Sequence, residues 1–249
     1  MLDLRIVGSV VATQKIANHN YASRGRSRHE PRNVRTVVRP AEKLGWQGAG
    51  ASGKRRMNLL AGTPREETTL DTEWLLLEPL MPEHAALLFE DLADERLYRL
   101  IPQNAPESSE ALETRYRKLS SRRSPDGSEV WLNFAMRLRE EGTLPKASYV
   151  GTLEATVFPN RSAYIAYTVF APFWRQGYAR EGCARMLRHL LEDYRVRVVV
   201  AEMDTRNAAS VALVESLGFE RVGTTLGADH FKGSVSDEHR YEQHVESDS

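Results

Sequence analysis

The residues best suited to chemistry lie where an apolar run gives way to a helical one, in segment 170–181. Gly177 is followed two places later by the small residue Ala179, and helical periodicity begins there without a break. The first N–H groups of a helix have no backbone partner, and the helix dipole adds positive potential around them. Two small residues let an anion approach this backbone closely, so the segment predicts an anion cradle. The structural alternative is ordinary packing, which also places small residues at helix starts.

The local spacing narrows the kind of anion that the cradle holds. No Gly-Lys-Ser/Thr triplet follows Gly177, so the segment is not the phosphate loop of a nucleoside triphosphatase. The three-glycine spacing of a dinucleotide-binding fold is not present either. The diphosphate of coenzyme A is the anion that remains.

Three ordered motifs then carry a resemblance to a known family. Residues 166–181 resemble the acetyl-CoA motif of the GNAT superfamily, closest to the branch that contains the N-terminal acetyltransferases of bacterial ribosomal proteins. Residues 204–219 are similar to the Asn-x-x-Ser helix of that branch, which ends in Gly-Phe, and residues 231–241 resemble its closing strands. The resemblance covers about Thr72 to Glu242. One position departs from the family pattern, because Trp174 stands where Gln or Arg is usual.

The resemblance implies an α+β GNAT fold, with a mixed, mostly antiparallel sheet splayed around an acetyl-CoA site and about four flanking helices. It implies an N-acetyltransferase, an acyltransferase that uses acetyl-CoA as its co-substrate. By the same resemblance, the pantetheine arm pairs with the strand before the loop, the loop amides hold the diphosphate, and the thioester oxygen accepts an N–H from the strand end. The residues that would bind acetyl-CoA are Thr168, Val169, Phe170, Arg175, Gln176, Gly177, Tyr178, Ala179, Arg180 and Asn207.

Two side chains are candidates for the chemical step. The attacking amine has to be neutral, and free α-amines titrate near about 7.7–8.0 against about 10.4 for lysine, so an α-amine needs little help from a base. Glu154 is the candidate base, acting through water, and its alternative is a surface carboxylate on an alternating strand. The resemblance makes Ser210 the candidate donor to the leaving thiolate; its alternative is the third residue of a helix capped by Asn207. Glu181 is interpreted as structural, because an acid in the first helical turn favours the dipole.

Alternating apolar and helical segments from Asp71 onward must position these residues. Strand patterns cover residues 74–77, 130–138, 148–158, 163–170, 196–203, 219–226 and 238–245. Helical patterns cover about 82–92, 108–119, 177–194 and 207–217. Short polar connections at 141–143 and 159–161 predict an antiparallel meander, and the strand, helix and strand that follow predict one parallel crossover.

Residues 1–58 differ from the rest of the chain in charge. The 249 residues have a formal net charge of zero, but this segment carries twelve lysine and arginine residues against three acidic ones. It has little hydrophobic period and ends near a Gly/Ala/Ser tract, so it has too little apolar surface to offset its ordering entropy. We therefore predict a basic disordered extension over 1–70 and a GNAT acetyltransferase domain over 71–249. The extension is either a tail that contacts RNA phosphates or the product of a mis-assigned start, with Met57 as the initiator.

The remaining composition predicts a cytoplasmic protein. No run reaches the ~18 apolar residues that span a bilayer, and the acidic Asp3 stands where a secretory signal carries positive charge. The single cysteine, Cys183, lies among apolar residues and is expected to be buried. The seven histidines include no pair at helical ligand spacing, which predicts no metal. We expect no membrane contact, nucleic-acid contact only through the basic extension, and a monomer or a homodimer.

Three functions from different classes remain open. The acceptor is a protein N-terminal α-amine, or it is a small amine such as an amino-acid derivative or an antibiotic; alternatively, the domain is non-catalytic and senses acyl-CoA. In the superfamily the acceptor lies against the segments that correspond to 99–109 and 226–237. An open groove there favours the protein acceptor. A closed pocket lined by aromatics such as Tyr98, Trp131 and Phe134 favours the small amine. The acidic balance of residues 59–249 favours a cationic acceptor in either case.

Overall fold

An eight-stranded sheet runs through residues 68–139 and 149–244, the part of the chain that the computed structural model describes. Most of the predicted basic extension, including Met57, and the predicted connection at 141–143 lie outside these residues. The predicted boundary between residues 70 and 71 falls within the short strand β1 (Leu70–Asp71), and Leu70 is buried in the core.

The chain alternates strands and helices in the predicted order. The first part contains β1, β2 (Leu75–Pro79), α2 (His84–Leu92), the 3₁₀ turn η1 (Glu95–Tyr98), α3 (Ser109–Leu119), β3 (Val130–Leu138), β4 (Tyr149–Val157) and β5 (Ser162–Val169). The second part contains the 3₁₀ turn η2 (Ala171–Phe173), α4 (Tyr178–Glu192), β6 (Val198–Asp204), α5 (Ala208–Ser216), β7 (Glu220–Phe231) and β8 (Ser234–His244). The predicted helices are confirmed, whereas β7 and β8 are longer than the strands that the sequence indicated.

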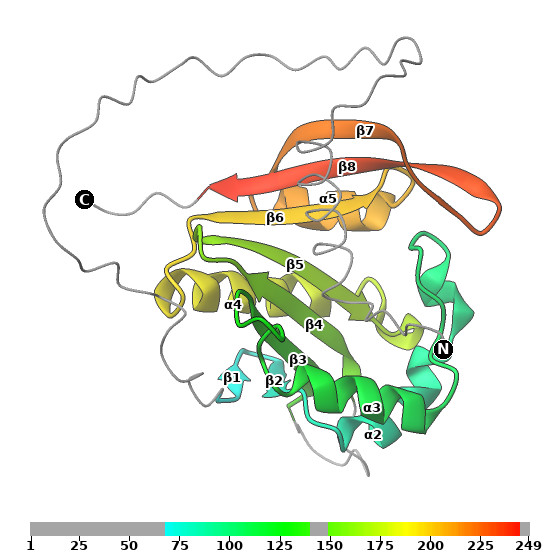
Figure 1. Cartoon of the computed structure of the whole chain (residues 1–249), viewed down its shortest axis with the longest axis vertical. Coiled ribbons are helices and arrows are strands. Elements are labelled where there is room, and N and C mark those ends of the chain that lie inside the picture. The colour runs from blue at the N-terminus through cyan, green and yellow to red at the C-terminus, as the bar shows by residue number, and fades with distance from the viewer. Residues whose placement is uncertain (1–67, 140–148, 245–249) are drawn as a thin grey trace, which may run out of the picture.

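The strands follow the order β1-β2-β3-β4-β5-β6-β8-β7, and every neighbouring pair is antiparallel except β5 and β6 (Figure 1). The predicted meander is β3, β4 and β5, and the predicted parallel crossover is β5-α4-β6. The parallel pair is short, since only residues 162–164 are in register with residues 198–200. Beyond Tyr164, β5 continues beside β4 while β6 continues beside β8. The sheet therefore splays between β5 and β6, as the GNAT resemblance implied.

Helices cover both faces of the sheet because its strands bury side chains on both sides. Leu132, Phe134 and Met136 of β3 belong to the core cluster that contains α4 and α5. Trp131 and Ala135, the alternating residues of the same strand, belong to the cluster that contains α2 and α3. Among the described residues, no helix combines the length and apolar character that crossing a membrane requires.

Side-chain caps fix where two of these helices begin. The hydroxyl of Ser108 accepts the N–H of Ala111 at 3.1 Å at the start of α3. The side-chain oxygen of Asn207 accepts the N–H of Ser210 at 3.1 Å at the start of α5, which confirms the predicted cap. Cys183 on α4 is fully buried, as predicted, and burial raises the pKa of its thiol to about 12.

Candidate active site

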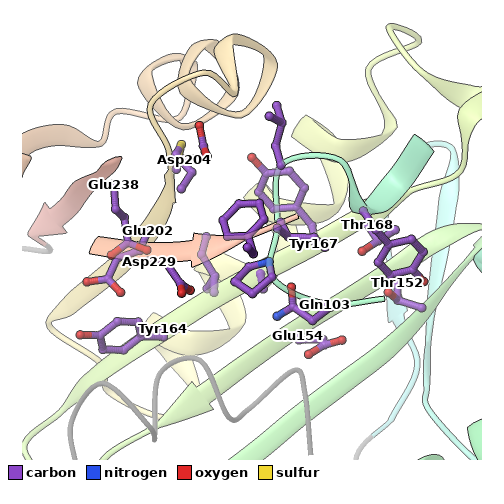
Figure 2. A pocket seen from close by; sticks show the side chains of 18 of the residues that line it. Gln103, Thr152, Glu154, Tyr164, Tyr167, Thr168, Glu202, Asp204, Asp229 and Glu238 are labelled. Carbon is purple, nitrogen blue, oxygen red and sulfur yellow. The ribbon is translucent and has the colours of Figure 1, made fainter. Parts of the chain in front are cut away.

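A cavity of about 230 Å³ opens where β5 and β6 separate (Figure 2). Its walls come from the separating strands, from the segment between α2 and α3, and from the β7–β8 hairpin. In the view of Figure 2, Glu202, Asp229 and Glu238 gather at one end and Thr152 and Thr168 lie at the other. The cavity thus brings together the two chain segments, 99–109 and 226–237, that were expected to face an acceptor.

The start of α4 lies close in sequence to the end of β5, separated from it by η2 and the loop 174–177. Gly177 adopts a left-handed conformation (φ 91°), which glycine tolerates best, and no side chain caps the helix there. The N–H groups of residues 178–180 form the first turn, where the helix itself supplies no acceptor. Arg175 and Arg180 are exposed beside this turn. Such a helix start is of the kind that can hold an anion, and the predicted cradle stays a prediction.

The last residues of β5 differ in the direction of their backbone groups. The N–H of Phe170 donates to the carbonyl of Val150 at 2.8 Å and so points toward β4. Backbone directions alternate along an antiparallel strand, so Val169 directs its N–H and carbonyl toward the opening. Of the predicted residues 168–170, Val169 is therefore the one whose N–H points into that opening.

Trp174, the residue that departs from the family pattern, forms a hydrogen bond to one of these backbone groups. Its indole N–H donates to the carbonyl of Val169 at 2.6 Å, and the guanidinium of Arg96 lies 5.9 Å from the centre of its ring. The side-chain amide of Gln176 in the same loop donates to the carbonyl of Pro172 at 2.9 Å. These contacts hold the loop against the end of β5.

Glu154 lies on β4 in the cavity wall, with a carboxylate oxygen that forms no hydrogen bond to a described residue. Its other oxygen lies 3.6 Å from the guanidinium of Arg115 on α3. Burial raises the pKa of Glu154, and the positive charge of Arg115 opposes part of that rise. A mostly buried carboxylate with a raised pKa and a free oxygen in a cavity wall is suited to accept a proton. The alternative, an ordinary surface carboxylate, does not match this burial.

Asn207 and Ser210 lie at the start of α5, which follows the end of β6. The cap uses the side-chain oxygen of Asn207 and the backbone N–H of Ser210, which leaves the Ser210 hydroxyl outside the cap. Burial raises the pKa of the Tyr167 phenol, and a side-chain hydrogen bond with Ser210 opposes part of that rise. The predicted serine is therefore a neighbour of Tyr167, a cavity-lining residue that the sequence did not single out.

Asp204, at the end of β6, forms hydrogen bonds to the neighbouring chain segments. Its buried carboxylate accepts hydrogen bonds from the backbone N–H of Arg206 at 2.8 Å, from the Arg206 guanidinium, and from the hydroxyl of Ser236 at 2.6 Å. These hydrogen bonds hold the pKa of Asp204 well below its usual range. These hydrogen bonds connect the end of β6 with Arg206, which precedes Asn207, and with strand β8.

Lys232 connects the two segments that enclose the cavity. This residue lies in the turn between β7 and β8, and its ammonium group donates to three backbone carbonyls of the segment after α2: those of Tyr98, Ile101 at 2.9 Å and Gln103 at 2.7 Å. Sequence reasoning placed Lys232 in a family motif without assigning it a contact. A single lysine in a hairpin gives no signal of a partner 129 residues or more away.

Of the three aromatic residues predicted for a closed pocket, only Tyr98 lines the cavity. Trp131 and Phe134 are buried elsewhere along β3. The other aromatic residues that line the cavity are Tyr116, Tyr164, Tyr167 and Phe231. The interpretation of Glu181 agrees with its contact, since its carboxylate accepts the N–H of Trp74 at 2.7 Å. Within the described ranges, no three His, Cys, Asp or Glu side chains are placed to hold a metal ion.

Comparisons of the sequence with known proteins identify a family and a relative of this chain. The acetyltransferase (GNAT) domain family matches residues 75–220, more than half of the chain. An FsC-acetyl coenzyme A-N(2)-transacetylase of Aspergillus fumigatus is 28% identical over 168 residues, which cover 65% of this chain and 69% of the relative.

Solved structures show the same fold. A complex of RimL, a ribosomal L7/L12 alpha-N-protein acetyltransferase, with coenzyme A superposes with a TM-score of 0.63 at 18% identity, covering 73% of this chain and all of that protein. The acetyltransferase from Salmonella typhimurium that modifies the N-terminal serine of ribosomal protein L7/L12 has a TM-score of 0.62 at 18% identity, covering 72% and 100%. The family match, the splayed sheet and the uncapped start of α4 lead to one conclusion: this chain belongs to the GNAT family and is an N-acetyltransferase.

Proposed function

We propose that this enzyme transfers the acetyl group of acetyl-CoA to a primary amine held in the cavity between β5 and β6. The diphosphate lies on the first-turn amides of α4, with Arg175 and Arg180 beside it, and the pantetheine arm follows Val169. One observation carries the proposal: β5 and β6 separate. The opening between them extends from the start of α4 to the cavity that holds Glu154. The residues fit the co-substrate, because Val169 directs its N–H into that opening and no side chain caps α4.

In this proposal acetyl transfer is direct. The amine nitrogen forms a bond to the thioester carbon, the carbon–sulfur bond breaks, and the proton that the amine loses passes to Glu154 or to water beside it. The N–H of Val169 donates to the thioester oxygen as negative charge grows there. Ser210 faces the sulfur from the opposite wall.

The acceptor that we favour is the α-amine at a protein or peptide N-terminus. Such amines are partly neutral near pH 7.5 because their pKa is about 7.7–8.0, so a single carboxylate with a raised pKa suffices as the base. Two structural neighbours are described as acetylating an N-terminus of a ribosomal protein, which supports this choice. Five acids line the cavity against one arginine, and their charge favours a cationic chain end.

A small-molecule amine is the second candidate acceptor. It is favoured by the aromatic lining of the cavity and by the Lys232 contacts, which close the wall between the two acceptor segments. The transacetylase of Aspergillus fumigatus, whose name gives an N(2) nitrogen as acceptor, is the relative that supports it.

Release of free CoA thiol from acetyl-CoA tests these alternatives. The full chain is assayed with N-terminal peptides, free amino acids and aminoglycosides, beside the Ser210→Ala variant. Turnover on peptides alone supports the protein acceptor, and turnover on amino acids or aminoglycosides alone supports the small amine. Acetyl-CoA binding without turnover on any amine contradicts the catalytic proposal and favours a sensing domain. Equal turnover by the chain begun at Met57 supports our proposal that the basic extension is dispensable.

Replacing Lys232 with methionine should weaken acceptor binding. The variant keeps the aliphatic stem but loses the three hydrogen bonds to the segment 98–103, so that segment becomes less ordered around the acceptor. We expect the KM for the acceptor to rise about tenfold while the KM for acetyl-CoA stays within about twofold. Steady-state kinetics with each substrate varied in turn measures both values.

Lys118→Met is the matched control for this prediction, because Lys118 is an exposed lysine on α3. It should leave both KM values unchanged. If Lys232→Met raised the two KM values equally, the loss would reflect general destabilisation, and the role of Lys232 at the acceptor wall would be rejected.

A further inference from the structure

Three polar atoms of cavity-lining residues form no hydrogen bond to a described residue. They are the side-chain oxygen of Gln103, the Nε of Arg115 and one carboxylate oxygen of Glu154, and all three atoms are shielded from solvent. A buried polar atom without a partner is unfavourable, and in native proteins it calls for an explanation such as a ligand. Figure 2 draws Gln103 and Glu154 among the side chains of the cavity. One ligand in this cavity is the simplest partner for all three atoms.

Contacts within the fold hold these three residues near one another. The ammonium of Lys232 donates to the backbone carbonyl of Gln103 at 2.7 Å and also to that of Tyr98. Burial raises the pKa of the Tyr98 phenol to about 12, and the charges of Arg115 and Glu154 act on it as well. The Arg115 guanidinium lies 3.6 Å from the second oxygen of Glu154. Tyr98 therefore connects the segment of Gln103 with the pair formed by Arg115 and Glu154.

The hydrogen-bonding types of the three atoms describe the ligand. Glu154 and Gln103 each offer an acceptor, and Arg115 offers a donor. The N-terminus of a peptide presents an amine donor, then the carbonyl acceptor of its first residue, then the N–H donor of its second residue. Two carbon atoms separate that amine from the carbonyl oxygen, so a guanidinium beside Glu154 suits the carbonyl of a ligand whose amine meets Glu154. A free amino acid has no second N–H, and a simple amine has no carbonyl either.

We propose that Arg115 and Gln103 are specificity-determining residues, which bind the first peptide unit of the acceptor. The Nε of Arg115 donates to the carbonyl oxygen of the acceptor's first residue, and the side-chain oxygen of Gln103 accepts the N–H of its second residue. The inference rests on the proposed function, because it requires the acceptor amine to lie beside Glu154. It narrows the acceptor to peptides and other compounds that carry an amide next to the amine.

Peptides that differ by one N-methyl group test the contact with Gln103. The acceptors are trialanine, trialanine methylated on the nitrogen of its second residue, and trialanine methylated on the nitrogen of its third residue. For the wild-type chain, we expect methylation at the second residue to lower kcat/KM about tenfold or more, because the Gln103 oxygen is left buried and unpaired. Methylation at the third residue should change kcat/KM by less than about twofold, and it serves as the control for the added bulk.

Gln103→Met separates a lost hydrogen bond from a steric clash, because methionine has a similar length and no amide oxygen. In this variant, trialanine and its second-residue methyl derivative should differ in kcat/KM by less than about twofold, since no acceptor is left unpaired. If the wild-type chain acetylates trialanine and its second-residue methyl derivative equally well, the inference is overturned. A difference between them that persists in Gln103→Met also overturns it.

Arg115→Lys tests the contact with the carbonyl. It keeps a positive charge beside Glu154 but removes the guanidinium, so we expect the KM for trialanine to rise about tenfold while the KM for acetyl-CoA stays within about twofold. Arg117→Lys is the matched control, because Arg117 lies on the same helix, does not line the cavity and pairs with Glu113 on an exposed face. It should leave both KM values unchanged. An unchanged KM for trialanine in Arg115→Lys would reject the role of Arg115.

The same assays distinguish this inference from the proposed function. If the wild-type chain acetylates simple amines or free amino acids as efficiently as trialanine, the inference is overturned and acetyl transfer to a primary amine stands. If the wild-type chain releases no thiol from acetyl-CoA with any amine, the proposed function and the inference fail together.

Discussion

Replacing Glu154 with glutamine is expected to lower kcat/KM for the acceptor by about two to three orders of magnitude near pH 7.5, the range that loss of a general base produces. The substitution keeps the shape of the side chain beside Arg115 and removes its ability to take a proton. Binding of acetyl-CoA, measured by titration calorimetry, should be unchanged because Glu154 does not lie at the start of α4. Thiol release with each substrate varied gives the kinetic values.

The role of Glu154 as the base also predicts the direction in which the rate changes with pH. Burial raises the pKa of Glu154 above its ordinary 4.5, so the wild-type rate should fall as the pH decreases through that raised value. The variant lacks this titration, so the ratio of wild-type to variant rates should shrink toward acidic pH. A constant ratio would count against Glu154 as the base.

Stability distinguishes this role from a structural one. A carboxyl whose pKa is raised in the folded state binds its proton more tightly than in the unfolded state, so its contribution to stability declines as pH rises from 4.5 through the raised value. Glu154→Gln removes that decline. We therefore expect the variant to be at least as stable as the wild type at pH 8, measured by urea unfolding. A large loss of stability there would mean that its low activity reflects misfolding.

Replacing Gly151 with alanine is expected to destabilise the protein by about 3 kcal/mol or more, as severe overpacking does. A methyl group at this position of β4 would lie 1.9 Å from the carbonyl oxygen of Thr168 and 2.9 Å from the side chain of Met136. The carbonyl belongs to β5, so relief requires β4 and β5 to move apart. The movement displaces the end of β5 as well, and acetyl-CoA binding should weaken together with stability.

Gly223→Ala is the matched control, because a methyl group there meets no atom within 4 Å. Urea unfolding and acetyl-CoA titration of both variants make the comparison. If Gly151→Ala matched the control in both measurements, the close approach of β4 and β5 would not constrain the site.

Strand and helix positions could be predicted from the sequence because their signals are local. The apolar run of β3 and the cap at Asn207 each depend on residues a few positions apart. The extent of β7 and β8 could not be predicted from the sequence. Glycine and polar residues near Gly227 end the apolar pattern there, whereas the strands continue past a register shift. Tertiary pairing, which propensity does not contain, sustains those strands.

Parts of the candidate site could likewise be predicted from the sequence, and other parts could not. The start of α4 was predictable because Gly177 and Ala179 lie next to each other in the sequence. The relation of Glu154 to Arg115, and of Tyr167 to Ser210, depends on which strand lies beside which helix. Trp131 and Phe134 were misplaced because alternation along a strand shows that residues are buried, but not which cavity they reach.

The short register between β5 and β6 has a consequence for how the molecule opens. Within the single sheet, three residue pairs join strands β1–β5 to strands β6–β8, so we expect amide hydrogen exchange to resolve two cooperative units that meet at this seam. Under the proposed function, acetyl-CoA binds across this seam and links the two units. Its presence should slow exchange on both sides at once, with protection that grows with the logarithm of its concentration above the dissociation constant. If exchange slows on both sides of the seam together, the bound co-substrate stabilises the sheet as an added strand between β5 and β6 would.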